Sequence, residues 1–135
     1  MNVPSLINYT EKRLSIKPKH LRPVIRIYNT GIIYLYNSLV TKLGLNAGDR
    51  IMFSRNRETN EWYICKDITG DGLKIRMYNK RTFSTSSTVL RKELIETSLG
   101  ILIDSDDKDS FYLGVDPVPS FHIKNNPHYK INFLL

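Results

Sequence analysis

The sequence predicts a mainly β fold with short helices (α+β, barrel-like), built from two similar strand–strand–helix–strand units. Two observations lead to this prediction: short runs in which apolar and polar residues alternate, and one such pattern that occurs twice. The chain has 135 residues, of which 41% are hydrophobic and 24% are charged. This composition is that of a globular domain with its own core.

The internal repeat is clearest where Val24–Asn29 aligns with Lys74–Asn79 at a shift of 50 residues. Three further segments match in the same order: Asn37–Val40 with Ser87–Leu90, Leu43–Leu45 with Leu99–Ile101, and Trp62–Asp67 with Phe111–Asp116. Two copies are too few for a solenoid, so we expect them to pack about an approximate two-fold axis. The alternative is that β-rich sequences simply resemble one another.

Four segments follow from this repeat, and 24–116 is expected to fold as one domain. They are an N-terminal basic arm (1–23), a first unit (24–70), a second unit (71–116) and a C-terminal extension (117–135). In the extension, Tyr129, Ile131 and Phe133 alternate with polar residues as in a strand. This strand either completes the chain's own barrel or adds to the sheet edge of a neighbour.

Each unit is expected to begin with a hairpin. Ile25 and Ile27 alternate with Arg26, and Leu73, Ile75 and Met77 alternate with basic residues, which is typical of half-buried strands. Turns at 29–31 and 79–81 lead to short second strands at 32–36 and 82–84. A strand over 50–54, a turn at 58–60 and a strand over 61–66 complete the first unit.

A short helix is expected after each hairpin. Asn37 and Ser87 are suited to cap the free amides at the start of the two helices. The apolar faces would consist of Leu39, Val40 and Leu43 in the first helix, and of Val89, Leu90, Leu94, Ile95 and Leu99 in the second. Gly44 and Gly100 are suited to the left-handed conformation that ends a helix.

A turn at Gly48–Asp49 precedes the next strand; the glycine allows a positive φ, and the carboxylate can accept hydrogen bonds from turn amides. Residues 31–54, followed by 61–66, resemble an AbrB/SpoVT-type module in their capped helix, Leu-Gly-Leu sequence and Gly-Asp turn. The resemblance covers roughly residues 24–67. It implies a swapped-hairpin (cradle-loop) barrel and DNA binding. The second unit lacks the Gly-Asp turn, so the two-fold relation would be approximate.

Basic and acidic residues are unevenly distributed along the chain, whose net charge is +7. Residues 1–57 carry ten Lys and Arg against two acidic residues, whereas 93–116 carry seven acidic residues against one Lys. The expected phosphate contacts are Arg22, Arg26, Lys74, Arg76, Lys80 and Arg81. Tyrosines 28, 34, 36 and 78 interleave with them and could stack bases. The alternative is that tyrosines cover a sheet face and arginines lie over them.

No catalytic, metal or cofactor site is expected. His20, His122, His128 and Cys65 lack the spacing of metal ligands. The acidic run at 104–109 lacks the central glycine and distal glutamate of a calcium loop, so it reads as a solvated turn. The Ser/Thr run at 82–88 reads as a strand end and a helix cap, and Cys65 as a small core residue.

We therefore expect a non-enzymatic DNA-binding or regulatory module. The alternative is a structural assembly protein, such as a virion or ring component, which packs against other subunits through 1–23 and 117–135 and through faces of opposite charge. No apolar run approaches the length of a membrane-spanning helix, and the N-terminus lacks a signal pattern. These features predict a cytoplasmic location, or a virion for the assembly alternative.

Overall fold

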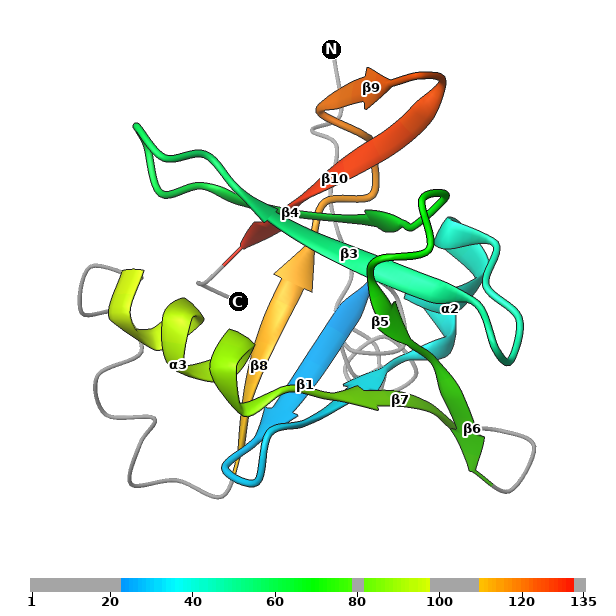
Figure 1. Ribbon diagram of the computed structural model, residues 1–135, viewed down its shortest axis with the longest axis vertical. Helices are drawn as coiled ribbons and strands as arrows, with labels where there is room; N and C mark the ends of the chain where they lie inside the picture. Colours follow the sequence, from blue (N-terminus) through cyan, green and yellow to red (C-terminus); the bar gives the residue numbers. More distant parts are fainter. Residues whose placement is uncertain (1–22, 79–81, 98–109, 133–135) are drawn as a thin grey trace, which may run out of the picture.

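The computed structural model describes residues 23–78, 82–97 and 110–132 and confirms the mainly β prediction (Figure 1). The strands are β1 (Val24–Tyr28), β2 (Ile32–Leu35), β3 (Arg50–Arg55), β4 (Trp62–Lys66), β5 (Leu73–Lys74), β6 (Arg76–Tyr78), β7 (Thr82–Ser86), β8 (Ser110–Val115), β9 (Phe121–Ile123) and β10 (Asn126–Asn132). The helices are α2 (Asn37–Leu43) and α3 (Thr88–Thr97). Most strand ends lie within two residues of those expected.

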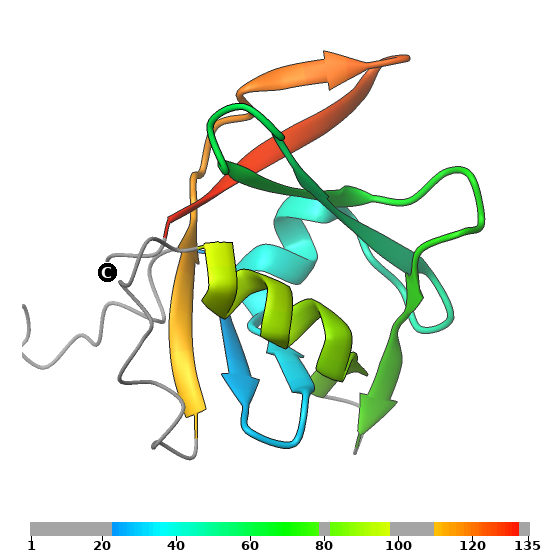
Figure 2. The same ribbon diagram turned by 60° about the vertical axis from the view of Figure 1, so that its left-hand side comes forward.

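All ten strands belong to one antiparallel sheet with the order β5-β3-β4-β10-β8-β1-β2-β7-β6, and β9 pairs with β10. The two ends of this order, β5 and β6, are consecutive in the chain and are separated only by Ile75. The Ile75 amide donates to the Asp49 carbonyl (2.7 Å), and the Ile75 carbonyl accepts from the Gly48 amide (3.1 Å). The sheet therefore curves round into a nearly closed barrel, as Figure 2 shows.

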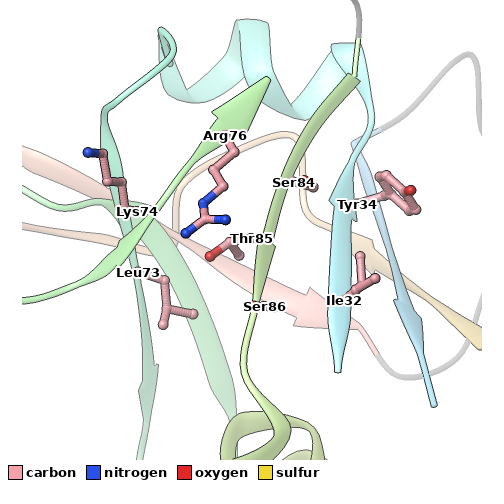
Figure 3. Close-up of a pocket in the computed structure, with 8 residues that line it drawn as sticks. All are labelled: Ile32, Tyr34, Leu73, Lys74, Arg76, Ser84, Thr85 and Ser86. Atoms are coloured by element: carbon pink, nitrogen blue, oxygen red, sulfur yellow. The ribbon is translucent and has the colours of Figure 1, made fainter. Parts of the chain in front are cut away.

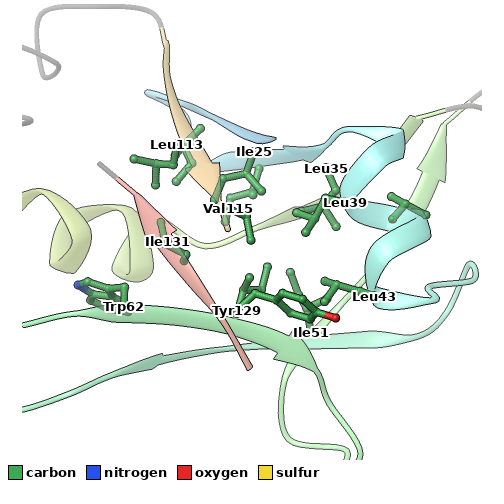
Figure 4. Packing of buried hydrophobic residues seen from close by; sticks show 14 of the residues in the cluster. Ile25, Leu35, Leu39, Leu43, Ile51, Trp62, Leu113, Val115, Tyr129 and Ile131 are labelled. Carbon is green, nitrogen blue, oxygen red and sulfur yellow. The ribbon is translucent and has the colours of Figure 1, made fainter. Parts of the chain in front are cut away.

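The core lies inside this barrel and is apolar. Alternate residues of the strands point into it, among them Ile25, Ile51, Leu113 and Ile131, each 2% exposed or less (Figure 4). Both helices add to the same cluster, α2 with Leu39, Val40 and Leu43, and α3 with Leu94. The apolar alternation in the sequence therefore identified the inner face of the barrel correctly at most positions.

The structure corrects three details of the expected pattern. Asn37 is the first residue of α2 and not its cap; Tyr36 occupies the cap position and makes no side-chain capping bond. Val89 is 67% exposed and Met77 is 39% exposed. Val89 lies in the first turn of α3, and Met77 lies on β6, which pairs with β7 alone among the described strands, so no described element covers either residue.

The local turn and cap predictions are confirmed at four positions. Ser87 Oγ accepts the Leu90 amide (3.1 Å) at the start of α3. Gly44 (φ 65°) ends α2 in the left-handed conformation, and Gly48 has φ 90°. Asp49 accepts the amide of Asn46 (2.8 Å) within the turn before β3. Leu99 and Gly100 lie outside the described residues.

The C-terminal strand β10 lies between β4 and β8. Its side chains Tyr129 and Ile131 are 6% and 2% exposed. Of the two roles that the sequence left open for this strand, the structure gives it the first: it completes the chain's own barrel. Phe133 lies outside the described residues. None of the described helices combines the length and apolar character needed to cross a membrane.

Candidate nucleic-acid interface

The outer face of one half of the barrel carries a row of polar side chains that crosses five neighbouring strands. Arg26 of β1 pairs with Tyr112 of β8 on one side and with Tyr34 of β2 on the other. Tyr34 in turn pairs with Ser84 of β7, and Ser84 pairs with Arg76 of β6. Directly paired residues of an antiparallel sheet lie on the same face. We call these five residues the tyrosine–arginine row. It faces outward because the neighbouring residues Ile25, Ile27, Ile33 and Leu113 point into the core.

Arg26 is held within this row by its neighbours. Its Nε donates to Ser110 Oγ at 2.8 Å. Its guanidinium carbon lies 4.7 Å from the ring centroid of Tyr28 and 5.0 Å from that of Tyr112. A guanidinium covered by aromatic rings keeps its charge while its flat faces are removed from water. Arg26 therefore lies over tyrosines. This is the arrangement expected from the alternative stated for the sequence, in which tyrosines cover a sheet face and arginines lie over them.

The tyrosines of this face contact one another on both sides of Arg26. Tyr28 and Tyr34 meet edge to face with ring centroids 5.3 Å apart, and Tyr36 stacks on Tyr112 at 6.2 Å. Burial, together with the hydrogen bond to Tyr112, raises the pKa of Tyr36 to about 12. This phenol therefore stays neutral in ordinary buffers and adds no negative charge to the face.

A groove with a volume of about 240 Å³ lies beside Tyr34, where β2 and β7 meet the bent strand β5–β6. Its lining consists of two cations, four hydroxyl-bearing side chains and two aliphatic side chains: Lys74, Arg76, Tyr34, Ser84, Thr85, Ser86, Ile32 and Leu73. Figure 3 shows the Arg76 side chain reaching between β6 and β7 toward Thr85. Guanidinium, ammonium and hydroxyl groups all donate hydrogen bonds, so this groove has the chemistry of an anion site.

The cations of this groove differ in their pairing from Lys130 and Lys66. Lys130 pairs with Glu61 (2.8 Å), and Lys66 pairs with Asp49 (3.5 Å). Lys74 and Arg76, in contrast, are exposed and form no ion pair with a described residue. No acidic residue lies on the outward positions of the described parts of β8, β1, β2, β7, β6 and β5. Among the described residues, this half of the barrel therefore presents positive charge that no acidic side chain on the same face balances.

The structure brings together three of the six residues predicted to contact phosphate: Arg26, Lys74 and Arg76. Arg22, Lys80 and Arg81 lie outside the described residues. Arg26 and Arg76 occupy matching positions of the repeat but differ in environment, because β1 lies between β2 and β8 whereas β6, within the described part of the chain, pairs with β7 alone. Arg26 and Arg76 thus share one face of the sheet but are not equivalent, and phosphate contact by the six residues stays a prediction.

The sequence reasoning missed Tyr112 and Ser110 as members of this face. Both lie on β8, which neighbours β1 although more than 80 residues separate them in the chain. The alternation of Ser110, Tyr112 and Gly114 with buried residues was a signal for an outward polar face. The alternation did not indicate which strand would lie next to β8 in the sheet.

The histidines and the cysteine among the described residues lie on β9, β10 and β4. His128 is buried, with Nδ1 3.0 Å from the Asn126 carbonyl, and His122 is exposed. Burial raises the pKa of the Cys65 thiol, as expected for a core cysteine. No group of three metal-ligating side chains occurs among the described residues. His20 and the acidic run 104–109 lie outside them.

Comparison of the chain with protein-family models, with curated proteins and with solved structures finds no match.

Proposed function

We propose that this chain is a non-enzymatic nucleic-acid-binding module that holds the sugar–phosphate backbone against the outer face of its barrel. The observation that carries this proposal is the strand register that sets Tyr112, Arg26, Tyr34, Ser84 and Arg76 side by side. Arginine and lysine supply the attraction to phosphate, and the partly exposed tyrosines supply neutral contacts, whereas Ser84 is only 3% exposed.

The spacing of the row suits a polyanion better than a single small anion. Arg26 and Arg76 are separated by three strand-to-strand steps, which is about 14 Å at the usual spacing. Arg26 is also held toward β8, away from Arg76, by Ser110 and Tyr112. This arrangement suits consecutive phosphates of a nucleic acid better than one small anion between the two arginines. The absence of acidic residues from the described part of this face removes a source of repulsion.

We further propose that the barrel is an internally duplicated, AbrB-like arrangement with an approximate two-fold axis between β2 and β7. The register supports this, because Tyr34 pairs with Ser84. These two residues are also matched by the 50-residue shift of the sequence repeat. A two-fold axis between two antiparallel strands pairs a residue with its own repeat counterpart, as this register does.

The strand neighbours support the same relation. Exchanging β1, β2, β3 and β4 for the bent strand β5–β6, β7, β8 and β10 reproduces every strand pair except that of β9 with β10, which has no counterpart in the first unit. Under this exchange β10 is the counterpart of β4, and β8 is the counterpart of β3. The proposal therefore replaces the sequence alignment of Trp62–Asp67 with Phe111–Asp116, and it extends the second unit to Asn132.

Titration with salt tests the binding proposal. The dissociation constant of a 20-nucleotide labelled DNA would be measured by fluorescence anisotropy from 25 to 300 mM NaCl, with the variants Arg76→Gln and Lys74→Gln. Each substitution is expected to weaken binding and to reduce the slope of log K against log salt by roughly 0.7 to 0.9 for each lost phosphate contact.

Matched controls separate a local effect from one of net charge. Arg57→Gln, in the turn between β3 and β4, and Lys42→Gln, on α2, remove the same charge from exposed positions off the row. These controls should bind nearly as the wild type does. If the controls weaken binding as much as Arg76→Gln does, or if the wild type does not bind at 25 mM salt, the proposal is wrong.

A role in subunit assembly is a second candidate, and strand β9 favours it. Among the described strands, β9 pairs only with β10, and Phe121 and Ile123 on it are 39% and 53% exposed. An apolar sheet edge of this kind is a surface on which a strand of another subunit can pair. Light scattering would show an oligomer that Ile123→Asp dissociates. A wild-type protein that stays monomeric at 100 µM would contradict this role.

A further inference from the structure

We propose that the nucleic acid bound by the tyrosine–arginine row is single-stranded, with bases on the tyrosines and a phosphate in the adjoining groove. This inference rests on the proposed nucleic-acid binding and names the class of strand. Three features of the face support it: the form of the surface, the continuity of its aromatic side chains, and the position of the cationic groove relative to Tyr34.

The first feature is the form of the surface. The row lies across an antiparallel sheet face formed by β8, β1, β2, β7 and β6. Neither described helix covers that face, since α2 and α3 insert Leu39 and Leu94 into the core on its other side. Duplex DNA is read by an element that enters a groove, whereas an open sheet face with aromatic residues accepts splayed bases.

The second feature is the unbroken series of contacts between planar side chains. Tyr34 meets Tyr28, Tyr28 and Tyr112 contact the guanidinium of Arg26 from their ring faces, and Tyr112 stacks on Tyr36. All five side chains are partly exposed. Mutual contact fixes the ring orientations before a ligand arrives, which lowers the entropic cost of stacking a base on them. Every base has a π face, so this surface would tolerate any sequence.

The third feature is that Tyr34 also lines the cationic groove, together with Lys74, Arg76 and Ser86. A base on Tyr34 would therefore lie directly beside donors for its own phosphate. From Tyr34 to Arg76 there are two strand-to-strand steps, about 10 Å. A nucleotide can span such a distance, and its base can stack on the Tyr34 ring only when one face of that base is free of neighbouring base pairs. A base inside a duplex cannot take this position.

The test compares single and double strands of one sequence. Binding of a mixed-sequence 20-nucleotide DNA, of the RNA with the same sequence and of the corresponding DNA duplex would be measured at 100 mM salt. We expect both single strands to bind at least tenfold more tightly than the duplex. Duplex binding that is equal or tighter would overturn this inference and leave the proposed function standing, whereas absence of all binding would overturn both.

A variant series tests the stacking. Tyr34→Leu is expected to weaken single-strand binding about tenfold, within the range for loss of one stacked base, while Tyr34→Phe retains binding. Tyr63→Leu, on β4 and away from the row, is the matched control and should bind as the wild type does. Equal affinities of Tyr34→Leu and Tyr34→Phe, with both variants folded by thermal unfolding, would overturn the inference.

Photocrosslinking of the wild-type protein keeps the inference testable if Tyr34→Leu fails to fold. A single-stranded DNA that contains 5-iodouracil would be irradiated in the complex, and the modified peptides would be identified by mass spectrometry. Crosslinks to Tyr28, Tyr34 or Tyr112 are expected, because the halogenated base would lie on these rings. Crosslinks confined to peptides outside β1, β2 and β8 would overturn the inference.

Discussion

Asp67 shapes the turn that leads from β4 to the bent strand β5–β6. Its Oδ1 accepts the Thr69 hydroxyl (2.6 Å) and amide (2.8 Å), and its Oδ2 accepts the amides of Gly70 (3.1 Å) and Gly72 (2.6 Å). These bonds, with that of the Thr69 hydroxyl the strongest, lower the pKa of Asp67 to about 2. Gly72 is confined as well, since a Cβ there would lie 2.2 Å from the Ile51 carbonyl oxygen.

The low pKa of Asp67 makes its contribution to stability depend on pH. A carboxyl whose folded pKa lies below its unfolded value stabilises the protein above the unfolded value, here 3.8, and loses that contribution as the pH falls toward about 2. We expect Asp67→Asn to unfold at a lower temperature than the wild type at pH 6, and the difference to diminish between pH 4 and pH 2. Thermal unfolding followed by circular dichroism measures this.

The control for this prediction is Asp71→Asn, which removes an exposed carboxylate from the same turn. Asp71 accepts none of the four bonds described above, so the difference between its variant and the wild type should change much less with pH. A Tm difference for Asp67→Asn that stays constant from pH 6 to pH 2 would contradict the assignment.

At the scale of elements, the two helices begin in different ways. The Ser87 hydroxyl caps α3, whereas α2 follows directly from β2 with Tyr36 at its cap position. The Tyr36 amide donates to the Val24 carbonyl (3.2 Å), which continues the pairing with β1 up to the first turn of the helix. The strand fixes the start of α2, so Asn37 lies inside the helix and does not cap it.

This difference predicts unequal costs for two similar substitutions. Ser87→Ala should lower the free energy of unfolding by about 1 kcal/mol, the usual value for loss of a capping hydroxyl. Asn37→Ala removes no capping bond and replaces a residue of lower helix propensity, so its effect should stay within about 0.5 kcal/mol. Urea denaturation of the two variants measures both values. Equal destabilisation would contradict the assignment of the caps.

At the scale of the whole molecule, β10 joins the two halves of the barrel. It is the shared neighbour of β4 and β8, and its buried residues belong to the same cluster as those of β1 and β3. Residues 117–135, assigned from the sequence to an extension, thus supply a central strand. The loss of core contacts from this strand should destabilise the entire domain.

Ile131→Ala should therefore lower the free energy of unfolding by roughly 2–4 kcal/mol, as for other large-to-small changes in a packed core. The matched control is Ile123→Ala on β9, where the side chain is 53% exposed and the cost should stay near 0.5 kcal/mol. Urea unfolding followed by the fluorescence of Trp62 gives both values. A small cost for Ile131→Ala, or separate transitions for the two halves of the barrel, would contradict this role of β10.

Local rules predicted the parts of the fold that depend on neighbours in the chain. The period of two identified Ile25 and Ile27 as inward residues, and backbone rules placed Gly44 and the Ser87 cap. Register between distant strands has no such local signal, so the contact of Arg26 with Tyr112 was not foreseen. The same limit explains why Arg26 and Arg76, which have similar local sequences, differ in exposure: the partner strands decide it.

The late position of β10 has a consequence for folding during synthesis. When the nascent chain has emerged from the ribosome up to Val115, β4 and β8 are available to fold, but β10, the strand that lies between them, is not. Until β10 emerges, both strands present open edges, and the apolar groups that Ile131 later covers face water. Completion of the barrel must therefore follow translation of nearly the whole domain, and the waiting chain would be a substrate for chaperones that shield unpaired strands.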